Sequence, residues 1–311
     1  MTAKSHIGEE TAEAIFARHR ARVFAIAYRF TGTVSDAEDV VQETWLRWNG
    51  IDTSEIRSPE AWLTTAAGRL GLDHLRRLRA RRETYVGPWL PEPIVEAASD
   101  RHEPTPEENL SLADDISMAL LHMLERLAPE ERAAFLLHEA FDYDYGELAT
   151  ILGKSQAACR QIVSRARRRV SDDRPRFHAS ARDHERLAAA FSHALAAEDS
   201  NALITCLQRD AILYSDGGGK AAAALNPIYS ADHIARFFTG IKKKFALPLD
   251  TMFVSINGEP GFALLHEGKM HSLLSIDVED GRIATIYIMR NPDKLARAAE
   301  TLGVELLQHF P

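Results

Sequence analysis

The sequence is short of cysteine, because Cys159 and Cys206 are the only two among 311 residues. Two cysteines far apart in the chain provide neither a disulfide framework nor a cysteine metal cluster. No apolar run reaches the roughly eighteen residues that cross a bilayer, and the amino-terminal segment carries charges where a signal peptide needs an apolar stretch. We therefore expect a cytoplasmic protein with no membrane segment, no metal and no cofactor.

Positive charge is also in the minority, with 37 Lys and Arg against 45 Asp and Glu and a net charge of −8. An acidic total disfavours a nucleic-acid partner, but here the charges are strongly segregated. Residues 69–82 hold six arginines and one acid, and residues 154–170 hold six bases and no acid. Residues 84–115 hold eight acids and one base. Two basic segments therefore flank an acidic connector.

The acidic connector is also rich in proline, at positions 88, 91, 93, 104 and 106. Proline lacks a backbone donor and favours extended conformations. We predict a linker over residues 86–109 between two helical units.

Three helices are predicted before the linker. The first begins near Ile15 and ends at a Thr-Gly-Thr break. The second opens at Ser35, which stands three residues before Glu38 in a capping-box arrangement. The third begins at Pro59, where a missing N–H is harmless, and runs to about Arg82.

The predicted secondary structure changes from all-helical to mixed after about residue 181. Before that point the pattern predicts helices only, over residues 107–126, 128–141, 143–152 and 154–170. After it, the pattern predicts one helical stretch from Asp183 to Leu207, a helix from Ser230, and a four-stranded antiparallel meander over residues 252–289. The sequence therefore predicts an α+β domain behind an all-helical front half.

Residues 143–170 have the pattern of a helix-turn-helix. Gly153 supplies the turn, Ser155 can cap the second helix, and apolar residues follow at spacings of four, three and four. Arg, Gln and Ser on the other face suit contacts with phosphates and base edges. The candidate DNA-contacting residues are Lys154, Ser155, Gln156, Arg160, Gln161, Ser164, Arg165, Arg167 and Arg168.

The alternative for residues 154–170 is an amphipathic helix whose arginines only solvate its outer face. Six positive charges without an acid, behind a well-formed turn, favour DNA binding.

Three segments, residues 36–48, 58–81 and 164–170, resemble the two conserved domains of the extracytoplasmic-function sigma factors. The resemblance covers residues 10–172 and implies a transcription initiation factor that binds RNA polymerase core, through its β′ and β subunits, and promoter DNA. It implies two all-α domains, a region 2 helical bundle over residues 1–85 and a region 4 helix-turn-helix domain over residues 110–172.

The same resemblance assigns residues to surfaces. The helix around residue 45 is expected to dock on the polymerase β′ chain, the third helix to open and read the minus-ten element, and the helix-turn-helix to read the minus-thirty-five element. Trp62 is expected in the core, and Gly68 and Gly71 depart from the family's better helix formers. The docking residues are Asp39, Val40, Gln42, Glu43, Trp45 and Leu46, and the minus-ten residues are Arg69, Asp73, His74, Arg76, Arg77 and Arg79.

Residues 181–311, after a short linker at 173–180, resemble the SnoaL-like branch of the NTF2-like cone fold. Three strings, WLPEP in the linker, DGGGK and NPDKL, are similar to those of the ECF41 subgroup of sigma factors, which carries this extension. The resemblance implies a regulatory domain acting in cis, with no separate anti-sigma protein, so removal of the chain after Arg174 is expected to change promoter activity. The candidate regulatory residues are Trp89, Leu90, Pro91, Glu92, Pro93, Asp216, Gly217, Gly218, Gly219, Lys220, Asn291, Pro292, Asp293, Lys294 and Leu295.

Other functions stay open from the residues themselves. A helix-turn-helix regulator with a ligand-sensing pocket would need only one basic helix, whereas this chain has two. Catalysis in the SnoaL-like pocket would use Asp216, His266 or His271, but no catalytic residue is assigned, because fold alone does not imply an enzyme. An unidentified small ligand for this pocket is compatible with either alternative.

Overall fold

The computed structural model describes residues 11–52, 56–82, 84–97, 117–172, 181–245 and 248–307. They form two compact units. Unit 1 joins the chain up to Arg79 with residues Ala128–Arg167, and unit 2 joins Ala80–Leu127 with the chain from Arg168 onward. The described part of the predicted linker and the first helix of the predicted 110–172 domain thus belong with the C-terminal domain. Within the described residues, no helix is both long and apolar enough to span a membrane.

Unit 1 is built from helices packed around aromatic side chains. Tyr28 and Trp48 are fully buried, and the Trp48 indole donates to the Ala12 carbonyl at 2.8 Å. Trp62, expected in the core, is only half-buried and packs against Trp48 at a ring distance of 5.3 Å. Unit 1 contains α1 (Ala12–Thr31), α2 (Val34–Asn49), most of α3 (Pro59–Arg82), α5 (Pro129–Phe135), a π-helical turn (Leu136–Ala140), α6 (Tyr145–Leu152) and most of α7 (Gln156–Asp172).

The start of α2 differs from the sequence prediction. Thr33, and not Ser35, caps the helix: its hydroxyl accepts from the Asp36 N–H at 3.3 Å and donates to the Asp36 carboxylate at 2.5 Å. Two capping frames overlap in this segment, one from Thr33 to Asp36 and one from Ser35 to Glu38. The earlier frame prevails because the turn at Gly32, where φ is +73°, ends α1 directly before Thr33.

Gly68 and Gly71 let α3 approach its neighbours closely. A Cβ at Gly71 would lie 2.9 Å from Cγ of Phe30 on α1, and a Cβ at Gly68 would lie 2.9 Å from a methyl group of Leu137. Both glycines therefore provide packing space, which explains why weak helix formers stand in the middle of α3.

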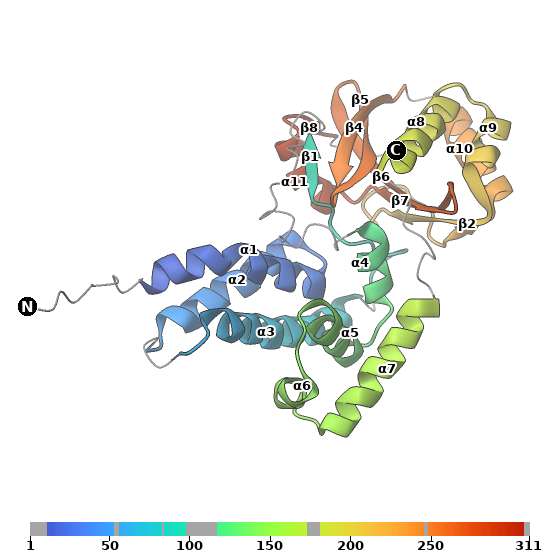
Figure 1. Cartoon of the computed structure of the whole chain (residues 1–311). Coiled ribbons are helices and arrows are strands. Elements are labelled where there is room, and N and C mark those ends of the chain that lie inside the picture. The colour runs from blue at the N-terminus through green and yellow to red at the C-terminus, as the bar shows by residue number, and fades with distance from the viewer. Residues whose placement is uncertain are drawn as a thin grey trace, which may run out of the picture. The chain divides into compact units, whose positions relative to one another are not determined.

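Unit 2 is centred on one mixed sheet with strand order β1-β4-β5-β6-β7-β2-β3, and β8 pairs with β6. The predicted four-stranded meander is present as β4 to β7, and its turn at Asp280 and Gly281 has left-handed φ values of 50° and 73°. Helices α8 and α10 lie against the sheet (Figure 1). The elements are β1 (Val95–Ala97), α4 (Met118–Glu125), α8 (Ala181–Ala196), α9 (Ser200–Cys206), β2 (Leu207–Asp216), β3 (Ile228–Tyr229), α10 (Ala231–Phe245), β4 (Asp250–Ile256), β5 (Glu259–His266), β6 (Lys269–Glu279), β7 (Arg282–Met289), α11 (Pro292–Thr301) and β8 (Glu305–Leu306).

Two helix predictions in unit 2 need correction. The single helix predicted from Asp183 to Leu207 is two helices, because Asp199 caps α9 by accepting from two backbone N–H groups at 3.0 Å. The described part of the helix predicted over residues 107–126 is α4, which Ser117 caps. The remainder of that prediction lies outside the described residues.

Part of the predicted linker is a strand of the C-terminal sheet. β1 pairs antiparallel with β4, and Val95 lies opposite Ile256. Figure 1 shows β1, drawn in teal, beside the orange β4. Leu90, just before this strand, is fully buried in the same apolar cluster as Met118 of α4. The C-terminal domain therefore binds the chain that connects the two basic segments.

Candidate nucleic-acid surfaces and the linker clamp

The basic face of α7 is exposed as the sequence indicated. Cys159, Val163, Ala166 and Val170 are buried on the opposite stripe, and the Ser155 hydroxyl accepts from the Ala158 N–H at 3.2 Å. The exposed residues are Lys154, Ser155, Gln156, Arg160, Gln161, Ser164, Arg165, Arg167 and Arg168. The helix therefore presents one continuous surface of cations and amides.

Two arginines of this surface contact acids of the preceding helices in unit 1. Arg167 lies 2.6 Å from Glu139, and Arg165 lies 3.7 Å from Glu131. Both arginine side chains are at least half exposed, whereas those of Glu139 and Glu131 are 30% and 10% exposed. Solvent therefore screens the pair with Glu139 more than the pair with the buried Glu131.

The basic side of α3 has a similar arrangement. Arg69, Asp73, Arg76 and Arg77 are exposed. Arg76 contacts Glu130 at the start of α5 at 3.1 Å and Asp73 at 3.4 Å. The side chain of Arg79 lies outside the described residues.

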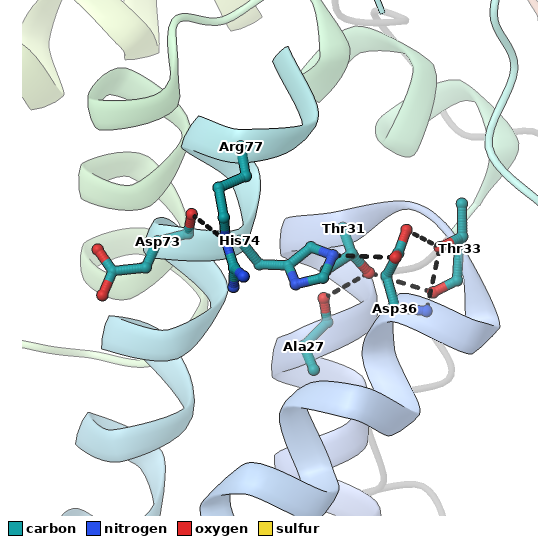
Figure 2. A network of polar contacts seen from close by, with 7 residues as sticks. All are labelled: Ala27, Thr31, Thr33, Asp36, Asp73, His74 and Arg77. Carbon is teal, nitrogen blue, oxygen red and sulfur yellow. Dashed lines mark hydrogen bonds and ion pairs between the residues drawn. The ribbon is translucent and has the colours of Figure 1, made fainter. Parts of the chain in front are cut away.

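His74 differs from the other residues of the predicted minus-ten surface. Its Nε2 lies 2.9 Å from a carboxylate oxygen of Asp36, which is itself bonded to Thr33. Figure 2 shows the ring reaching from α3 to the start of α2, away from the side chain of Arg77. The histidine thus ties α3 to the cap of α2 and positions the helix that carries the arginines.

The predicted polymerase-docking helix presents a mixed surface. Asp39, Gln42 and Glu43 are exposed, and Leu46 is 56% exposed, which is high for a large apolar side chain. Trp45 is half-buried against Phe16, with ring centroids 5.0 Å apart. Val40 is 3% exposed and packs in the core, so it supports this surface from below.

A densely bonded polar site lies in unit 2, where Asp216 at the end of β2 is fully buried. Its carboxylate accepts from the Tyr85 hydroxyl at 2.6 Å, the Leu90 N–H at 2.9 Å and the Lys294 ammonium at 2.7 Å. Leu90 lies in the predicted linker and Tyr85 directly precedes it, whereas Lys294 belongs to α11. From here on, residues 85–97 are called the linker segment. We call Tyr85, Leu90, Asp216, Asn291 and Lys294 the linker clamp.

Lys294 completes the clamp in several ways. Its ammonium donates to the Leu90 carbonyl at 2.5 Å and lies 4.0 Å from the ring centre of Trp89. Asn291 caps α11 and donates to the Tyr85 hydroxyl at 2.8 Å. Burial and the negative charge of Asp216 raise the pKa of Tyr85 well above its usual value, so this phenol stays a donor.

The glycines of the DGGGK string are packed in a tight turn and are not a loose loop. A Cβ on Gly217 would lie 2.2 Å from the Ala221 carbonyl oxygen, and one on Gly218 would lie 2.4 Å from the Asn291 side chain. Gly218 and Gly219 also have positive φ values of 59° and 73°. The turn brings Lys220 to Asp293 as an exposed ion pair at 2.5 Å.

The structure thus brings together the three strings that the sequence analysis singled out. Pro91 and Pro93 are buried, and the buried Glu92 lies 3.8 Å from Arg297 of α11. Leu295 is fully buried in the same cluster as Leu90. Pro292 begins α11. The contact is between the linker segment and the C-terminal domain.

Sequence reasoning missed two important residues. The sequence analysis did not single out Tyr85. Its nearness to the WLPEP string, which begins four residues later, was the only feature that could have indicated a role. Arg132 of α5 is 1% exposed, and its guanidinium donates twice to the Arg29 carbonyl near the end of α1, at 2.9 and 2.6 Å. Burial lowers the pKa of Arg132 to about 9.

The pocket acids and bases considered for catalysis have other contacts. Asp216 belongs to the clamp, and His266 lies 3.0 Å from the Pro248 carbonyl oxygen. His271 lies 3.0 Å from the Arg290 guanidinium, which can only donate, so its Nε2 accepts. Burial lowers the pKa of His271 to about 4, and the ring is neutral near pH 7.

Comparison with known proteins identifies two conserved regions in the helical part of the chain. The family model for sigma-70 region 2 matches residues 15–82, and that for sigma-70 region 4 matches residues 117–170. The chain is 38% identical to the ECF RNA polymerase sigma factor SigJ of Mycobacterium tuberculosis, over 88% of this chain and 90% of that protein. It is 28% identical to the probable ECF RNA polymerase sigma factor SigI of the same organism, over 92% of this chain and 95% of that protein.

The likeness extends to three-dimensional structure. The crystal structure of Mycobacterium tuberculosis SigJ superimposes with a TM-score of 0.72 at 34% identity, covering 90% of this chain and 97% of that one. The shared fold therefore includes the strand-rich C-terminal domain as well as the helices.

Proposed function

This chain belongs to the extracytoplasmic-function RNA polymerase sigma factors, and we propose that its C-terminal domain sets the activity of the two promoter-reading regions by holding the linker between them. Sigma factors bind RNA polymerase core and direct it to promoters. The alternative of a helix-turn-helix regulator is not favoured, because it does not account for the match of residues 15–82 to sigma-70 region 2.

The exposed face of α7 reads the minus-thirty-five element as duplex DNA. The support is the surface of arginines and amides behind the capped turn, where Arg160 also stacks over the Tyr145 ring at 5.1 Å. Arg69, Arg76 and Arg77 on α3 bind the phosphates of the opened minus-ten strand. His74 contributes to this surface by positioning α3.

The docking surface for the β′ chain is the exposed side of α2. Asp39, Gln42 and Glu43 suit basic partner residues, and the exposed Leu46 suits an apolar one. Trp45 provides the edge of the surface, and the buried Val40 holds it in place.

Regulation in cis rests on the linker clamp. The observation that carries it is the buried Asp216 carboxylate, which is bonded both to linker residues and to Lys294 of α11. Breaking such a site requires uncovering a buried charge, so the linker leaves its position only when polymerase or another ligand supplies the free energy. The chain acts in the cytoplasm, where polymerase is, as a non-enzymatic factor that needs no separate anti-sigma protein.

The minus-ten and minus-thirty-five elements are by name about 25 base pairs apart, which at about 3.4 Å per base pair is about 85 Å of duplex. In unit 1, Arg132 of region 4 is bonded to the Arg29 carbonyl of region 2. Regions 2 and 4 cannot stay in direct contact while they read two elements that are so far apart. Unit 1 therefore has to open on the promoter.

A reconstituted transcription assay with polymerase core and the full chain tests the clamp. Asp216→Asn keeps the shape and removes the charge that Lys294 binds, and we expect a change in promoter-specific run-off yield of about threefold or more. Glu305→Gln is the matched control, because it breaks an exposed pair with Lys269 in the same unit, outside the candidate regulatory residues. Equal yields from both variants contradict regulation by the clamp, while absence of any complex with core contradicts the sigma-factor function itself.

A further inference from the structure

The C-terminal domain contains a cavity that the promoter-reading function does not use. Two adjoining cavities of about 430 and 540 Å³ share the lining residues Phe238, Ile241, Leu249, Leu264, His271 and Arg290. Ligand sites for small molecules have volumes of about 300–1,000 Å³. The space is therefore large enough for a ligand of ten or more non-hydrogen atoms, in a domain that already has a packed core on the other side of its sheet.

The walls of this cavity are mainly apolar. Phe238 and Ile241 come from α10, Leu264 comes from β5, and Leu249 directly precedes β4. Glu198 lines the first cavity and Arg236 the second, and both side chains are exposed to solvent. Charged groups on exposed side chains contribute little to binding in the interior, because water screens them.

A buried cation stands on the sheet side of this apolar space. Arg290 is 9% exposed, and its guanidinium donates to the Ala222 carbonyl and to Nε2 of His271, the latter at 3.0 Å. The other nitrogen of His271, Nδ1, therefore carries the ring proton and faces the Ser272 hydroxyl at 3.1 Å. Both of these partners of Arg290 are neutral, since the pKa of His271 lies at about 4.

A buried guanidinium beside an apolar cavity defines the chemistry of a ligand. Burial lowers the pKa of Arg290 to about 10, so it keeps its charge at neutral pH but has lost hydration. Because Arg290 lines both cavities, an anion that enters them can pair with this charge, and a carboxylate matches the planar guanidinium. A neutral ligand of the same shape gains only the apolar contacts.

Arg290 is also joined to the linker clamp through the backbone. Its N–H and that of Asn291 both donate to the Asp216 carbonyl, at 2.7 and 2.9 Å. Its side chain holds the Ala222 carbonyl, two residues beyond Lys220 and the glycine turn. A shift of Arg290 toward a ligand therefore acts on the turn, on Asp216 and on the cap of α11 together.

We propose that the cavity binds an apolar monocarboxylate whose anionic group pairs with Arg290, and that its occupancy changes how firmly the clamp holds the linker. The claim that the cavity binds a ligand depends only on the cavity and Arg290. The claim that the ligand changes the clamp rests on the proposed function, because it makes the linker the element that the ligand controls.

The first test compares 2-naphthoate with the neutral isostere 2-naphthamide as probes, by isothermal titration calorimetry on the full chain. We expect the carboxylate to bind about tenfold or more tightly. In the Arg290→Met variant that preference disappears, and in the Arg290→Lys variant it is retained. Equal affinities for the two probes on the unaltered chain, or no heat from either, overturn the proposal.

A second variant covers the case in which a change at Arg290 disturbs folding. Ile241→Trp on α10 fills the cavity from a half-buried position, away from the clamp. We expect it to abolish binding of naphthoate while the melting temperature stays within about 2 °C of the unaltered chain. Undiminished binding by this variant shows that the probe sits elsewhere and overturns the assignment.

Hydrogen–deuterium exchange tests the coupling. Saturating naphthoate is expected to change the exchange of the amides in residues 85–97, and the Ile241→Trp variant is expected to show no such change. Binding without any change at residues 85–97 overturns the regulatory half and leaves both the binding site and the sigma-factor function standing. Failure of the chain to form a complex with polymerase core in the reconstituted transcription assay would instead count against the proposed function.

Discussion

The two units differ in how far their ion pairs are exposed to solvent. In unit 1, Arg76, one of the arginines proposed to bind the promoter, pairs with Glu130, and the two side chains are 44% and 42% exposed. In unit 2, Asp216 and Lys294 of the clamp are 0% and 8% exposed. Exposed pairs contribute about 0–1 kcal/mol, whereas removing one partner of a buried pair costs about 3–5 kcal/mol. The exposed pair of unit 1 therefore costs little to separate, whereas breaking the buried pair of unit 2 is costly.

The largest expected effect is on the clamp. Lys294→Met leaves the Asp216 charge buried without its cation, and we expect the unit that contains the sheet to lose about 3–5 kcal/mol. Differential scanning calorimetry of the full chain measures this as a lowered transition. Lys220→Met, which breaks an exposed pair in the same loop, serves as control and is expected to cost less than about 1 kcal/mol. Similar losses from both variants would show that burial does not distinguish the clamp.

The second effect concerns a buried contact in unit 1. Arg132→Met removes the donors from the Arg29 carbonyl, which lies in the last turn of α1 where carbonyls have no helical partner. The expected cost is about 1–3 kcal/mol in the transition of unit 1. Arg47→Met, which removes only an exposed pair with Glu43 on α2, is the control. If Arg47→Met costs as much, burial does not distinguish the contact between Arg132 and the Arg29 carbonyl.

The third effect is a pH dependence confined to unit 2. His122 of α4 packs against the rings of both Tyr214 and Tyr287, at centroid distances of 4.3 and 5.5 Å. Burial lowers its pKa from 6.5 to about 4, so its contribution to stability is complete above pH 6.5 and is lost as the pH falls toward 4. Between pH 7 and pH 5 the unaltered chain should lose about 2 kcal/mol more than the His122→Phe variant. Parallel stability curves for the two proteins would contradict this.

The fourth effect separates two glycines that look alike in the sequence. Gly71→Ala places a Cβ against Cβ and Cγ of Phe30. These atoms lie close to the backbone of α1 and cannot move far, so we expect a destabilisation of about 1–3 kcal/mol. Gly68→Ala meets only the flexible end of Leu137 and gains helix propensity, so the net change should lie within about 1 kcal/mol. Urea denaturation followed by circular dichroism gives both values. A stabilised Gly71→Ala variant would show that α3 and α1 are less tightly packed than described.

How much of this could be predicted depends on whether local pattern decides it. The helix-turn-helix, the α3 boundaries and the meander follow from periodicity and turn residues, as the exposed arginines of α7 and the Asp280–Gly281 turn illustrate. Tyr85 and Arg132 could not be found this way, because their partners lie 131 and 103 residues away in the chain. The linker was read as extended from its prolines, and its pairing with β4 depends on a strand that the proline pattern does not encode.

The smallest effect on stability should have a visible effect on DNA binding. Glu130→Gln releases Arg76 from an exposed ion pair, so the folding free energy should change by less than about 0.5 kcal/mol. If Arg76 binds phosphate, the loss of a competing carboxylate should raise the affinity of the full chain for a labelled single-stranded oligonucleotide about twofold at low salt, and the gain should vanish at high salt. Fluorescence anisotropy at several salt concentrations measures this. Glu60→Gln breaks a pair of similar exposure with Arg22, away from the arginines of α3, and should leave the affinity unchanged. Equal gains from both variants would mean that only the total charge matters, whereas a gain confined to Glu130→Gln identifies the contact between regions 2 and 4 as one that DNA must displace.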